Sequence, residues 1–277
     1  METWKLELLY LGKMRCKKHR MIRTENREET MEIPVTAVLL RHPQYGNILY
    51  DTGNAANWAS CLPEPTRRDF PITEWISIES ALREKGLSPD EIDVLILSHL
   101  HFDHVGGLQE FAGTKAGGAV RVSRSELSNA LVKAFTGYVG GYVKSLIDVP
   151  GITYMPVDQE MELFPGLRLF LQQSHAPGLI GLEVKTEDYG TVLCVSDAVY
   201  LQESDEKQLP PDSPNQEVAR GFLENLKELR RRRRETGAVI LYGHDWKQTE
   251  AWVTKKADQS DSRKDNSENV EPTFHGR

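Results

Sequence analysis

The sequence of 277 residues is poor in cysteine, with only Cys16, Cys61 and Cys194, which lie far apart. An odd number at these distances offers neither a disulfide framework nor a paired-cysteine zinc motif. A reducing compartment is the simplest setting for such a chain. We therefore expect a cytoplasmic protein.

An excess of basic residues and long apolar runs are missing as well. The 34 lysines and arginines are outnumbered by 41 aspartates and glutamates, which gives a net charge of -7. A protein that binds nucleic-acid backbone would present a basic face, so this balance argues against a nucleic-acid partner. No apolar run approaches the roughly 18 residues of a membrane span, and residues 4–11 are too short and too charged for a signal peptide. We expect a soluble protein with no membrane partner.

Apolar residues are also nearly absent from residue 254 onward, where lysine, aspartate, serine, asparagine and glutamate dominate. Such a segment cannot bury enough surface to offset the entropy lost on ordering. The rest of the chain is different, because hydrophobic residues make up 39% of the whole sequence and suffice for the core of one large domain. We predict one folded domain over residues 1–253 and a disordered tail over residues 254–277.

Strand-like and helical patterns occur in two series along this domain, and in each series strands are followed by a helix. This arrangement predicts an α/β fold with four layers, an αββα sandwich. The predicted strands cover residues 4–11, 35–41, 47–51, 93–98, 152–157, 167–172, 181–185, 190–195 and 238–242. The predicted helices cover residues 76–85 and 215–235, and a further helical stretch opens residues 125–142.

A cluster of metal-ligand side chains follows the apolar run over residues 94–97. Within six residues it contains His99, His101, Asp103 and His104. So many lone pairs at the junction of a strand and a loop would repel one another unless a cation lay between them. The spacing favours two cations over one.

Three more candidate ligands follow predicted strands farther along the chain. His175 comes after the strand over residues 167–172, Asp197 after the strand over 190–195, and His244 after the last strand. Strand ends and the loops beyond them display reactive side chains above a rigid sheet. Together with the first cluster, these residues make five histidines and two aspartates, a complete binuclear set if one carboxylate bridges.

The run His99-Leu-His101-Phe-Asp103-His104 resembles the H-x-H-x-D-H motif of the metallo-β-lactamase superfamily. The resemblance covers about residues 1–252 and implies an αββα sandwich with two metal ions at its rim. It implies that His99, His101 and His175 hold one ion, that Asp103, His104 and His244 hold the other, and that Asp197 and a hydroxide bridge them. It also matches Asp51-Thr-Gly53 to a D-T-G motif whose aspartate supports metal ligands. A plain turn is the alternative for Asp51.

Finer features resemble the N-acyl homoserine lactonases of that superfamily. They are Phe102 inside the motif, Tyr200 three residues after the bridging aspartate, and Gly243-His-Asp245 followed by Gln248. In that group the tyrosine hydroxyl helps to polarise the lactone carbonyl, and a buried structural tyrosine is the alternative. The family often has a second histidine where this chain has Leu179, so the surroundings of the first metal are expected to differ.

The resemblance implies a metal-dependent hydrolase that opens the lactone ring of N-acyl homoserine lactones, which is quorum quenching, by attack of the bridging hydroxide. Asp103 would pass a proton to the leaving alkoxide or act as a ligand only. Zinc is the expected metal, and iron, manganese and cobalt also suit these ligands. The expected partner is a small-molecule lactone, and the expected assembly is a monomer or homodimer. Alternatives are a lactonase for another ring such as 4-pyridoxolactone, a glyoxalase II-like thioesterase, an RNase Z-like phosphodiesterase, or a non-catalytic protein with structural metals.

An acyl substrate also needs an apolar groove, for which the sequence offers several aromatic side chains. Aromatics at such spacing also occur in cores, which is the alternative for each of them. Residues 14–31, which are rich in charge, are expected to form a flap near the entrance. The candidate pocket residues are Trp58, Phe70, Trp75, Phe102, Phe135, Tyr138 and Tyr142.

Overall fold

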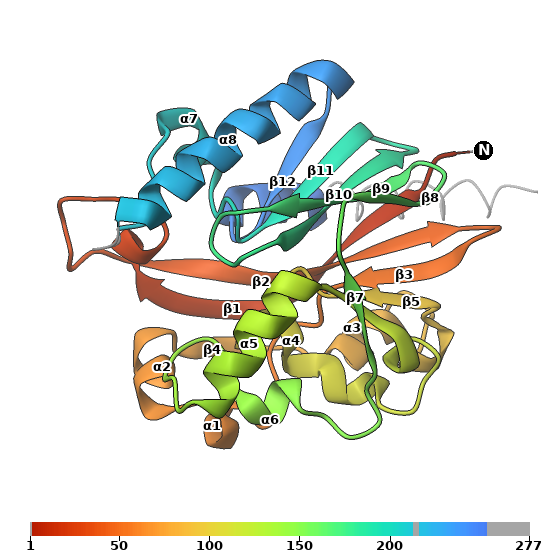
Figure 1. Ribbon diagram of the computed structural model, residues 1–277, viewed down its shortest axis with the longest axis horizontal. Helices are drawn as coiled ribbons and strands as arrows, with labels where there is room; N and C mark the ends of the chain where they lie inside the picture. Colours follow the sequence, from red (N-terminus) through yellow and green to blue (C-terminus); the bar gives the residue numbers. More distant parts are fainter. Residues whose placement is uncertain (1, 213–215, 254–277) are drawn as a thin grey trace, which may run out of the picture.

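The computed structural model describes residues 2–212 and 216–253, and the predicted tail over residues 254–277 lies outside the described residues. Two β-sheets stack face to face, with strand orders β4-β1-β2-β3-β5-β6-β7 and β12-β11-β10-β9-β8. Helices cover the outer face of each sheet, as Figure 1 shows for α8 above one sheet and α3, α4 and α5 below the other. The predicted α/β architecture with four layers, αββα, is confirmed.

The first sheet contains β1 (Lys5–Lys17), β2 (Thr30–His42), β3 (Gly46–Tyr50), β4 (Ile72–Trp75), β5 (Val94–Ile96), β6 (Val120–Ser123) and β7 (Tyr154–Val157). The second contains β8 (Met161–Phe164), β9 (Leu167–Gln172), β10 (Leu179–Thr186), β11 (Gly190–Ser196) and β12 (Val239–Tyr242). The α-helices are α1 (Trp58–Cys61), α2 (Glu64–Asp69), α3 (Ile78–Arg83), α4 (Phe102–Val105), α5 (Arg124–Phe135), α6 (Lys144–Ile147), α7 (Gln202–Lys207) and α8 (Gln216–Thr236), and residues 246–253 are also helical. Among the described residues, no helix is long and apolar enough to cross a membrane.

Alternation of apolar residues along the strands explains the layers, because successive side chains of a strand point to opposite faces. In β2, Val38 and Leu40 face the core between the two sheets, whereas Leu39 faces the helices of the first outer layer. In β11, Cys194 faces the same central core, and Val195 packs under α8. The strands are thus buried on both faces, and their apolar runs are nearly continuous.

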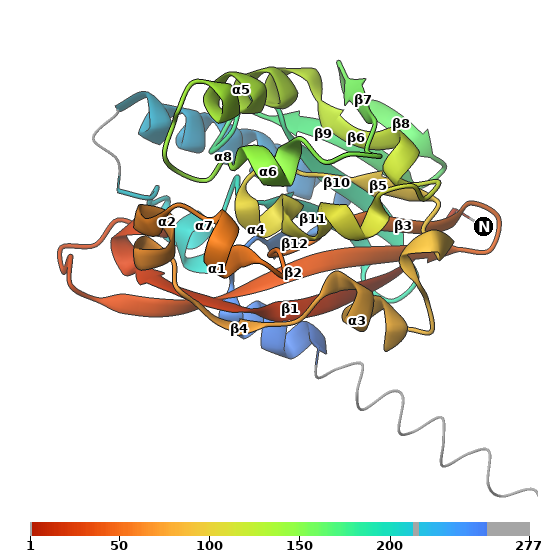
Figure 2. The same cartoon turned by 90° about the horizontal axis from the view of Figure 1, so that it is seen from below.

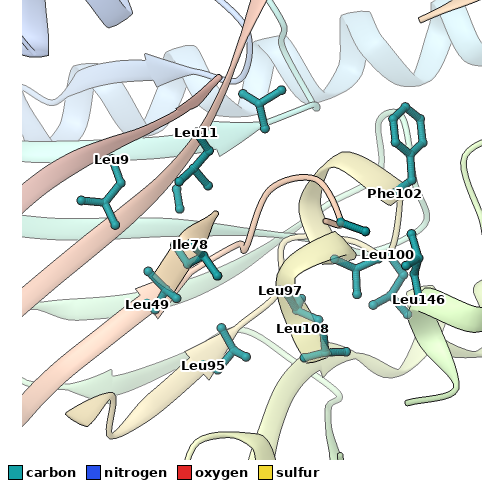
Figure 3. Packing of buried hydrophobic residues seen from close by; sticks show 14 of the residues in the cluster. Leu9, Leu11, Leu49, Ile78, Leu95, Leu97, Leu100, Phe102, Leu108 and Leu146 are labelled. Atoms are coloured by element: carbon teal, nitrogen blue, oxygen red, sulfur yellow. The ribbon is translucent and has the colours of Figure 1, made fainter. Parts of the chain in front are cut away.

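The outer layer of the first sheet is held by a large apolar cluster. Leu9 and Leu49 of the sheet share this cluster with Ile78 of α3 and with Leu108 and Leu146 beyond the ligand loop (Figure 3). Leu100 is fully buried in the same cluster, although it lies in the loop between two predicted ligands. The loop is therefore anchored by apolar packing at its centre.

The hairpin of β1 and β2 is longer than the sequence patterns predict. Its register shifts between Tyr10 and Lys13, where Gly12 adopts a φ of 105°. A Cβ at Gly12 would lie 2.2 Å from the carbonyl oxygen of Glu74 in the neighbouring β4, so only glycine allows this approach. The bulge interrupts the alternation, and the strand continues to Lys17 beyond the predicted end at residue 11.

Candidate metal centre

The motif residues are presented by the turn from β5 into α4. His99 lies in the loop after β5, His101 precedes the first residue of α4, and Asp103 and His104 lie within α4. The backbone N–H of Leu100 donates to Glu126 Oε1 at 2.9 Å, which adds a polar anchor to the apolar one. The ring centroids of His99 and His104 lie 4.2 Å apart, so the loop and α4 present their side chains to the same place.

The second sheet supplies the other three predicted ligands. Strands β9, β11 and β12 run in the same direction, since β10 is antiparallel to β9 and β11, and β12 is parallel to β11. The loops after these three strands therefore lie at one edge, where they carry His175, Asp197 and His244. The structure brings all seven predicted ligands together, and the ligand atoms within each of two groups lie within 4.8 Å of one another. One group is His99, His101, His175 and Asp197, and the other is Asp103, His104 and His244.

The carboxylate of Asp197 lies between the two groups. Its Oδ2 is 3.4 Å from Nε2 of His175, and its Oδ1 is 3.0 Å from Nε2 of His244 and 3.1 Å from Nε2 of His104. One oxygen therefore faces each group. This is the arrangement that a bridging carboxylate needs.

The spacing of the donor atoms suits a bound metal ion better than it suits hydrogen bonds among the donors themselves. Nε2 of His175 lies 3.0 Å from Nε2 of His99 and 2.9 Å from Nδ1 of His101, so three ring nitrogens share one small space. Nε2 of His104 and Oδ1 of Asp197 are buried and, although 3.1 Å apart, are not joined by a hydrogen bond of good geometry. A buried polar atom without a partner costs about 1–3 kcal/mol. Imidazole and carboxylate ligands suit divalent ions, so the residues present fit a divalent metal ion.

Hydrogen bonds on the far side of the imidazole rings fix their orientation. Nδ1 of His244 donates to the carbonyl oxygen of Pro34 at 2.8 Å, and Nδ1 of His104 lies 2.9 Å from Oδ2 of Asp51. Nδ1 of His175 lies 2.7 Å from the hydroxyl of Tyr200. A proton on each Nδ1 leaves the lone pair of Nε2 directed at the centre, as metal ligation requires.

Asp51, directly after β3, forms hydrogen bonds with the ligand loop. Its Oδ1 accepts the backbone N–H of Ser98 at 2.7 Å, and its Oδ2 accepts the Ser98 hydroxyl at 2.7 Å beside Nδ1 of His104. Asp51 has a φ of 67°, a conformation that L-residues rarely adopt. The side chain thus ties the strand end to the ligand loop, which agrees with the supporting position expected from the D-T-G motif.

Backbone strain concentrates at this site. In the described part of the chain, four non-glycine residues have a positive φ: Asp51, His175, Ser196 and Gln208. Three of the four either contact the centre or directly precede Asp197. Strained backbone of this kind persists where surrounding contacts fix it, and it occurs often at functional sites.

Charge and burial act together on the protonation of the ligands. Burial lowers the pKa of His99 and His101 well below the usual value and lowers the pKa of His175 to about 4, so these rings are neutral ligands. Burial alone would raise the pKa of Asp197, but the neighbouring His104 and His244 hold it well below its usual range. These groups thus have the forms that bind metals, a neutral imidazole or an ionised carboxylate. Burial would lower the pKa of His104 and His244, but Asp197 raises it above the usual value, so these two rings lose a proton when they bind a metal.

Tyr200 lies on the cavity side of His175. Burial, with Asp197 and Asp103 nearby, raises the pKa of its hydroxyl well above the usual value. The side chain therefore stays a neutral phenol across the working pH range. When Nδ1 of His175 donates to the phenol oxygen, the hydroxyl hydrogen of Tyr200 remains available to a ligand in the cavity.

The centre opens into a cavity of about 300 Å³. Among the predicted pocket aromatics, Phe70, Phe102 and Tyr138 line it. Tyr142 packs edge-on against His101, with ring centroids 4.4 Å apart, and its hydroxyl donates to Glu126. The other described lining residues are Arg20, Met21, Ile33, Pro65, Thr66, Asp69, His101, Asp103, Val139, Gly140, Gly141, His175, Asp197, Tyr200 and His244.

Four predicted pocket aromatics, Tyr142 among them, lie outside this cavity lining. Trp58 packs against the apolar cluster of the first outer layer, and the indole N–H of Trp75 donates to the carbonyl oxygen of Asn54. Phe135 is 57% exposed, with the ammonium of Lys144 4.1 Å from its ring centroid. These positions depend on packing between distant segments, which spacing along the chain does not reveal.

The expected flap over residues 14–31 is only partly a separate element. Met14 and Cys16 are buried within β1, and residues 30 and 31 belong to β2. Within residues 14–31, Arg20 and Met21 at the end of the hairpin line the cavity. The high charge of this stretch favoured a flap in the prediction, although alternate residues of the strand within it are apolar.

Leu179, which replaces the second histidine of the family pattern, is fully buried at the start of β10. It forms a small apolar cluster with Ala176 and Ala198 on either side of the ligand loops. Apolar packing thus takes the place of a polar contact near His175.

Several supporting residues were not predicted from the sequence. Glu126 anchors the ligand loop, Ser98 contacts Asp51, and the Ser196 hydroxyl donates to the Ser98 hydroxyl at 3.0 Å. Ser98 and Ser196 each stand next to a predicted ligand, so adjacency is the one sequence signal that pointed to them. Glu126 has none, because α5 lies 22 residues beyond His104.

Comparisons with known proteins agree with this geometry. Residues 31–244 match the metallo-beta-lactamase superfamily. The N-acyl homoserine lactonase AiiA of Bacillus thuringiensis subsp. kurstaki is 31% identical over 231 residues, which cover 79% of this chain and 84% of that protein. The N-acyl homoserine lactonase AttM of Azorhizobium caulinodans is 27% identical over 274 residues, covering 91% and 96%. A solved N-acyl homoserine lactone hydrolase with the product N-hexanoyl-L-homoserine at its catalytic metal center has a TM-score of 0.76 and 28% identity, covering 90% of this chain and 96% of that one.

Proposed function

The chain belongs to the metallo-beta-lactamase superfamily and, within it, to the N-acyl homoserine lactonases, and we propose that it hydrolyses the lactone ring of N-acyl homoserine lactones. The activity is metal-dependent, and its biological role is quorum quenching. The observation that carries this proposal is one cavity in which Asp197 lies between two ligand groups and Tyr200 faces the same space. Ester opening needs both features, an electrophilic centre and a neutral donor.

Two divalent ions, expected to be zinc, would occupy the centre. His99, His101 and His175 would hold one, with Asp197 shared, and Asp103, His104 and His244 would hold the other. When bound, such ions polarise an ester carbonyl and lower the pKa of a water molecule toward neutrality. Five of the seven ligands, His101, Asp103, His175, Asp197 and His244, line the cavity, so a substrate can reach the centre, which distinguishes it from an enclosed structural metal site.

The side chains of the cavity have distinct parts in the reaction. The Tyr200 hydroxyl donates to the carbonyl oxygen as that oxygen gains negative charge during addition of water. When the ring C–O bond breaks, the Asp103 carboxyl carries a proton to the alkoxide oxygen. The product is an N-acyl homoserine, with the water oxygen on the acyl carbon and one proton on the new hydroxyl.

The lining of the cavity argues against a glyoxalase II-like or RNase Z-like reaction. Substrates of that kind carry charged groups and need free cations in the pocket. Among the described lining residues, Arg20 is the only lysine or arginine, and it is paired with Asp69. A neutral lactone with an apolar chain fits this lining better.

The proposal predicts the behaviour of three forms of the enzyme in pH-stat hydrolysis of N-acyl homoserine lactones. The wild type should be active, and His104→Ala should lose at least 100-fold in kcat/KM because one ligand is gone. Tyr200→Phe should lose roughly 10–1,000-fold in kcat, with a smaller change in KM, since its hydrogen bond strengthens in the transition state. Elemental analysis should give two metal ions per wild-type chain.

The outcomes separate the parts of the proposal. A wild type that opens no homoserine lactone would overturn the function. Full activity in Tyr200→Phe would remove the role of the hydroxyl but leave the metal centre in place. One ion per active chain would contradict the binuclear assignment alone.

A further inference from the structure

The cavity that contains the metal ligands also contains a charged pair that the reaction does not use. Arg20 belongs to the short 3-10 turn η1 (Lys18–Arg20) at the end of the β1–β2 hairpin, and Asp69 is the last residue of α2. Their charged groups lie 2.5 Å apart, and both side chains line the cavity. Figure 2 shows the end of this hairpin beside α2 at one end of the molecule. The pair therefore joins two walls of the cavity.

Contacts along the wall define an order from the metal ligands to this pair. Phe102 stands between the ligands His101 and Asp103, and its ring centroid is 6.4 Å from that of Phe70. The guanidinium carbon of Arg20 lies 5.3 Å from the centroid of the Phe70 ring. A chain that leaves the metal ligands along this wall meets two aromatic rings first and an ion pair after them.

Burial makes this pair a poor surface for an alkyl chain. The Arg20 and Asp69 side chains are only 39% and 29% exposed, so the pair already has limited access to water. Nε of Arg20 is buried without a hydrogen-bond partner. An alkyl chain lying over the pair would remove the remaining water and offer no hydrogen bond in return. A chain that ends over Phe70 gains apolar burial without this cost.

The size of the cavity supports the same limit. Its volume of about 300 Å³ is at the lower end of the range for small-molecule sites, roughly 300–1,000 Å³. Its apolar lining includes Met21 and Ile33 as well as the two rings. Space and polarity thus both favour a short acyl group.

We propose that Arg20 and Asp69 determine acyl-chain specificity, so that the enzyme prefers N-acyl homoserine lactones with short chains, such as hexanoyl, over long ones, such as decanoyl. The inference rests on the proposed function, because it assumes that homoserine lactones are the substrates. The pair acts as a polar end wall: chains that stop before it are accommodated, and chains that reach it bind poorly.

The test compares kcat/KM for hexanoyl- and decanoyl-homoserine lactone in the zinc-loaded, full-length enzyme. The wild type should favour the hexanoyl substrate. The double variant Arg20→Met/Asp69→Leu, which replaces the pair with apolar side chains, should raise the decanoyl-to-hexanoyl ratio at least tenfold, chiefly through a lower KM for the decanoyl substrate. The hexanoyl substrate, whose shorter chain has less contact with the pair, should change less than the decanoyl substrate.

Two matched controls test whether the effect belongs to this pair. Arg124→Met/Asp158→Leu removes an exposed ion pair outside the cavity lining and should leave the ratio unchanged. The charge exchange Arg20→Asp/Asp69→Arg retains an ion pair at the same place and should retain the preference for hexanoyl. An unchanged ratio in the apolar double variant would overturn the inference, since the chain then leaves by another route, such as over Tyr138 and Val139.

If the double variant does not fold, the wild type alone can still overturn the inference about chain length. Equal or better kcat/KM for the decanoyl substrate would overturn the inference without any variant. If the wild type opens neither lactone, the proposed function fails instead. The two failures are thus distinguishable in one set of assays.

Discussion

Glu126 is a carboxyl group with no exposed surface that lies behind the ligand loop and contacts none of the seven ligands directly. It accepts hydrogen bonds from the backbone N–H of Leu100, from the amide of Asn129 and from the hydroxyl of Tyr142. Burial raises its pKa to about 7, in spite of these three donors, which favour the charged form. The group that holds the ligand loop is therefore titratable near neutral pH.

This shift predicts how stability depends on pH. The pKa of Glu126 is about 7 in the folded protein and near the ordinary value of 4.5 in the unfolded chain. Its contribution to stability is therefore complete below pH 4.5 and is lost as the pH rises through 7. Between these limits Glu126→Gln should gain stability relative to wild type, by an amount on the order of 3 kcal/mol.

Urea unfolding of both metal-free proteins from pH 4.5 to pH 8 measures this difference, and titration of the histidine ligands cancels between them. Glu126→Ala serves as the control, because it lacks an acceptor for Leu100 and should be destabilised at every pH. A difference between wild type and Glu126→Gln that does not vary with pH would contradict the raised pKa.

At the scale of single residues, the sequence pointed to the candidate ligands because four of them form one motif after β5 and the other three each follow a strand of the second sheet. His99 to His104 form one contiguous motif, and His175, Asp197 and His244 each follow an apolar run that ends at the same edge of the second sheet. Residues that act across the fold were not identifiable in this way. Glu126 reaches Leu100 from another element, and the position of Trp75 depends on contacts with Asn54.

At the scale of elements, α8 shows how reliably a long periodic pattern predicts structure. Leu226 and Leu229 are buried on the stripe that packs beneath the helix, against Val195 and Ile240 of the second sheet. Leu223 lies on the same helix but is 37% exposed. The short strands β4, β6 and β8 were not predicted, whereas the equally short β5 and β12 were, because every residue of those two strands is apolar.

This helix predicts a clear contrast between two identical substitutions. Leu226→Ala should lower the free energy of unfolding by about 2–4 kcal/mol, since it leaves a cavity under α8. Leu223→Ala, with the same change in size and helix propensity, should cost less than about 1 kcal/mol. Urea denaturation at constant metal load measures both. Similar losses in the two variants would mean that α8 does not pack as described.

For the whole molecule, the metal centre connects the two sheets. Each ligand group combines residues from the loop after β5, in the first sheet, with residues from loops of the second sheet. A ligand that binds only the folded form stabilises it by mass action, by about 2.7 kcal/mol at 100 times Kd. Bound metal should therefore stabilise the contact between the two halves of the sandwich.

Removal of metal should lower Tm by roughly 5–10 °C relative to enzyme with zinc at 100 times Kd, and added zinc should restore it. Differential scanning calorimetry before and after chelation measures the shift. His104→Ala should lose most of this response, whereas a substitution of His42, which lies away from the centre in β2, should keep it. An unchanged Tm after chelation, with elemental analysis showing no remaining metal, would contradict the link between the sheets.

The division of the chain between the two sheets falls between Val157, which ends β7, and Met161, which begins β8. Four ligands precede this point and three follow it, and neither group is complete on either side. Neither half of the chain can therefore assemble the centre alone. The centre forms only when the two halves dock. Metal occupancy in this fold therefore reports that the two halves of the chain have docked.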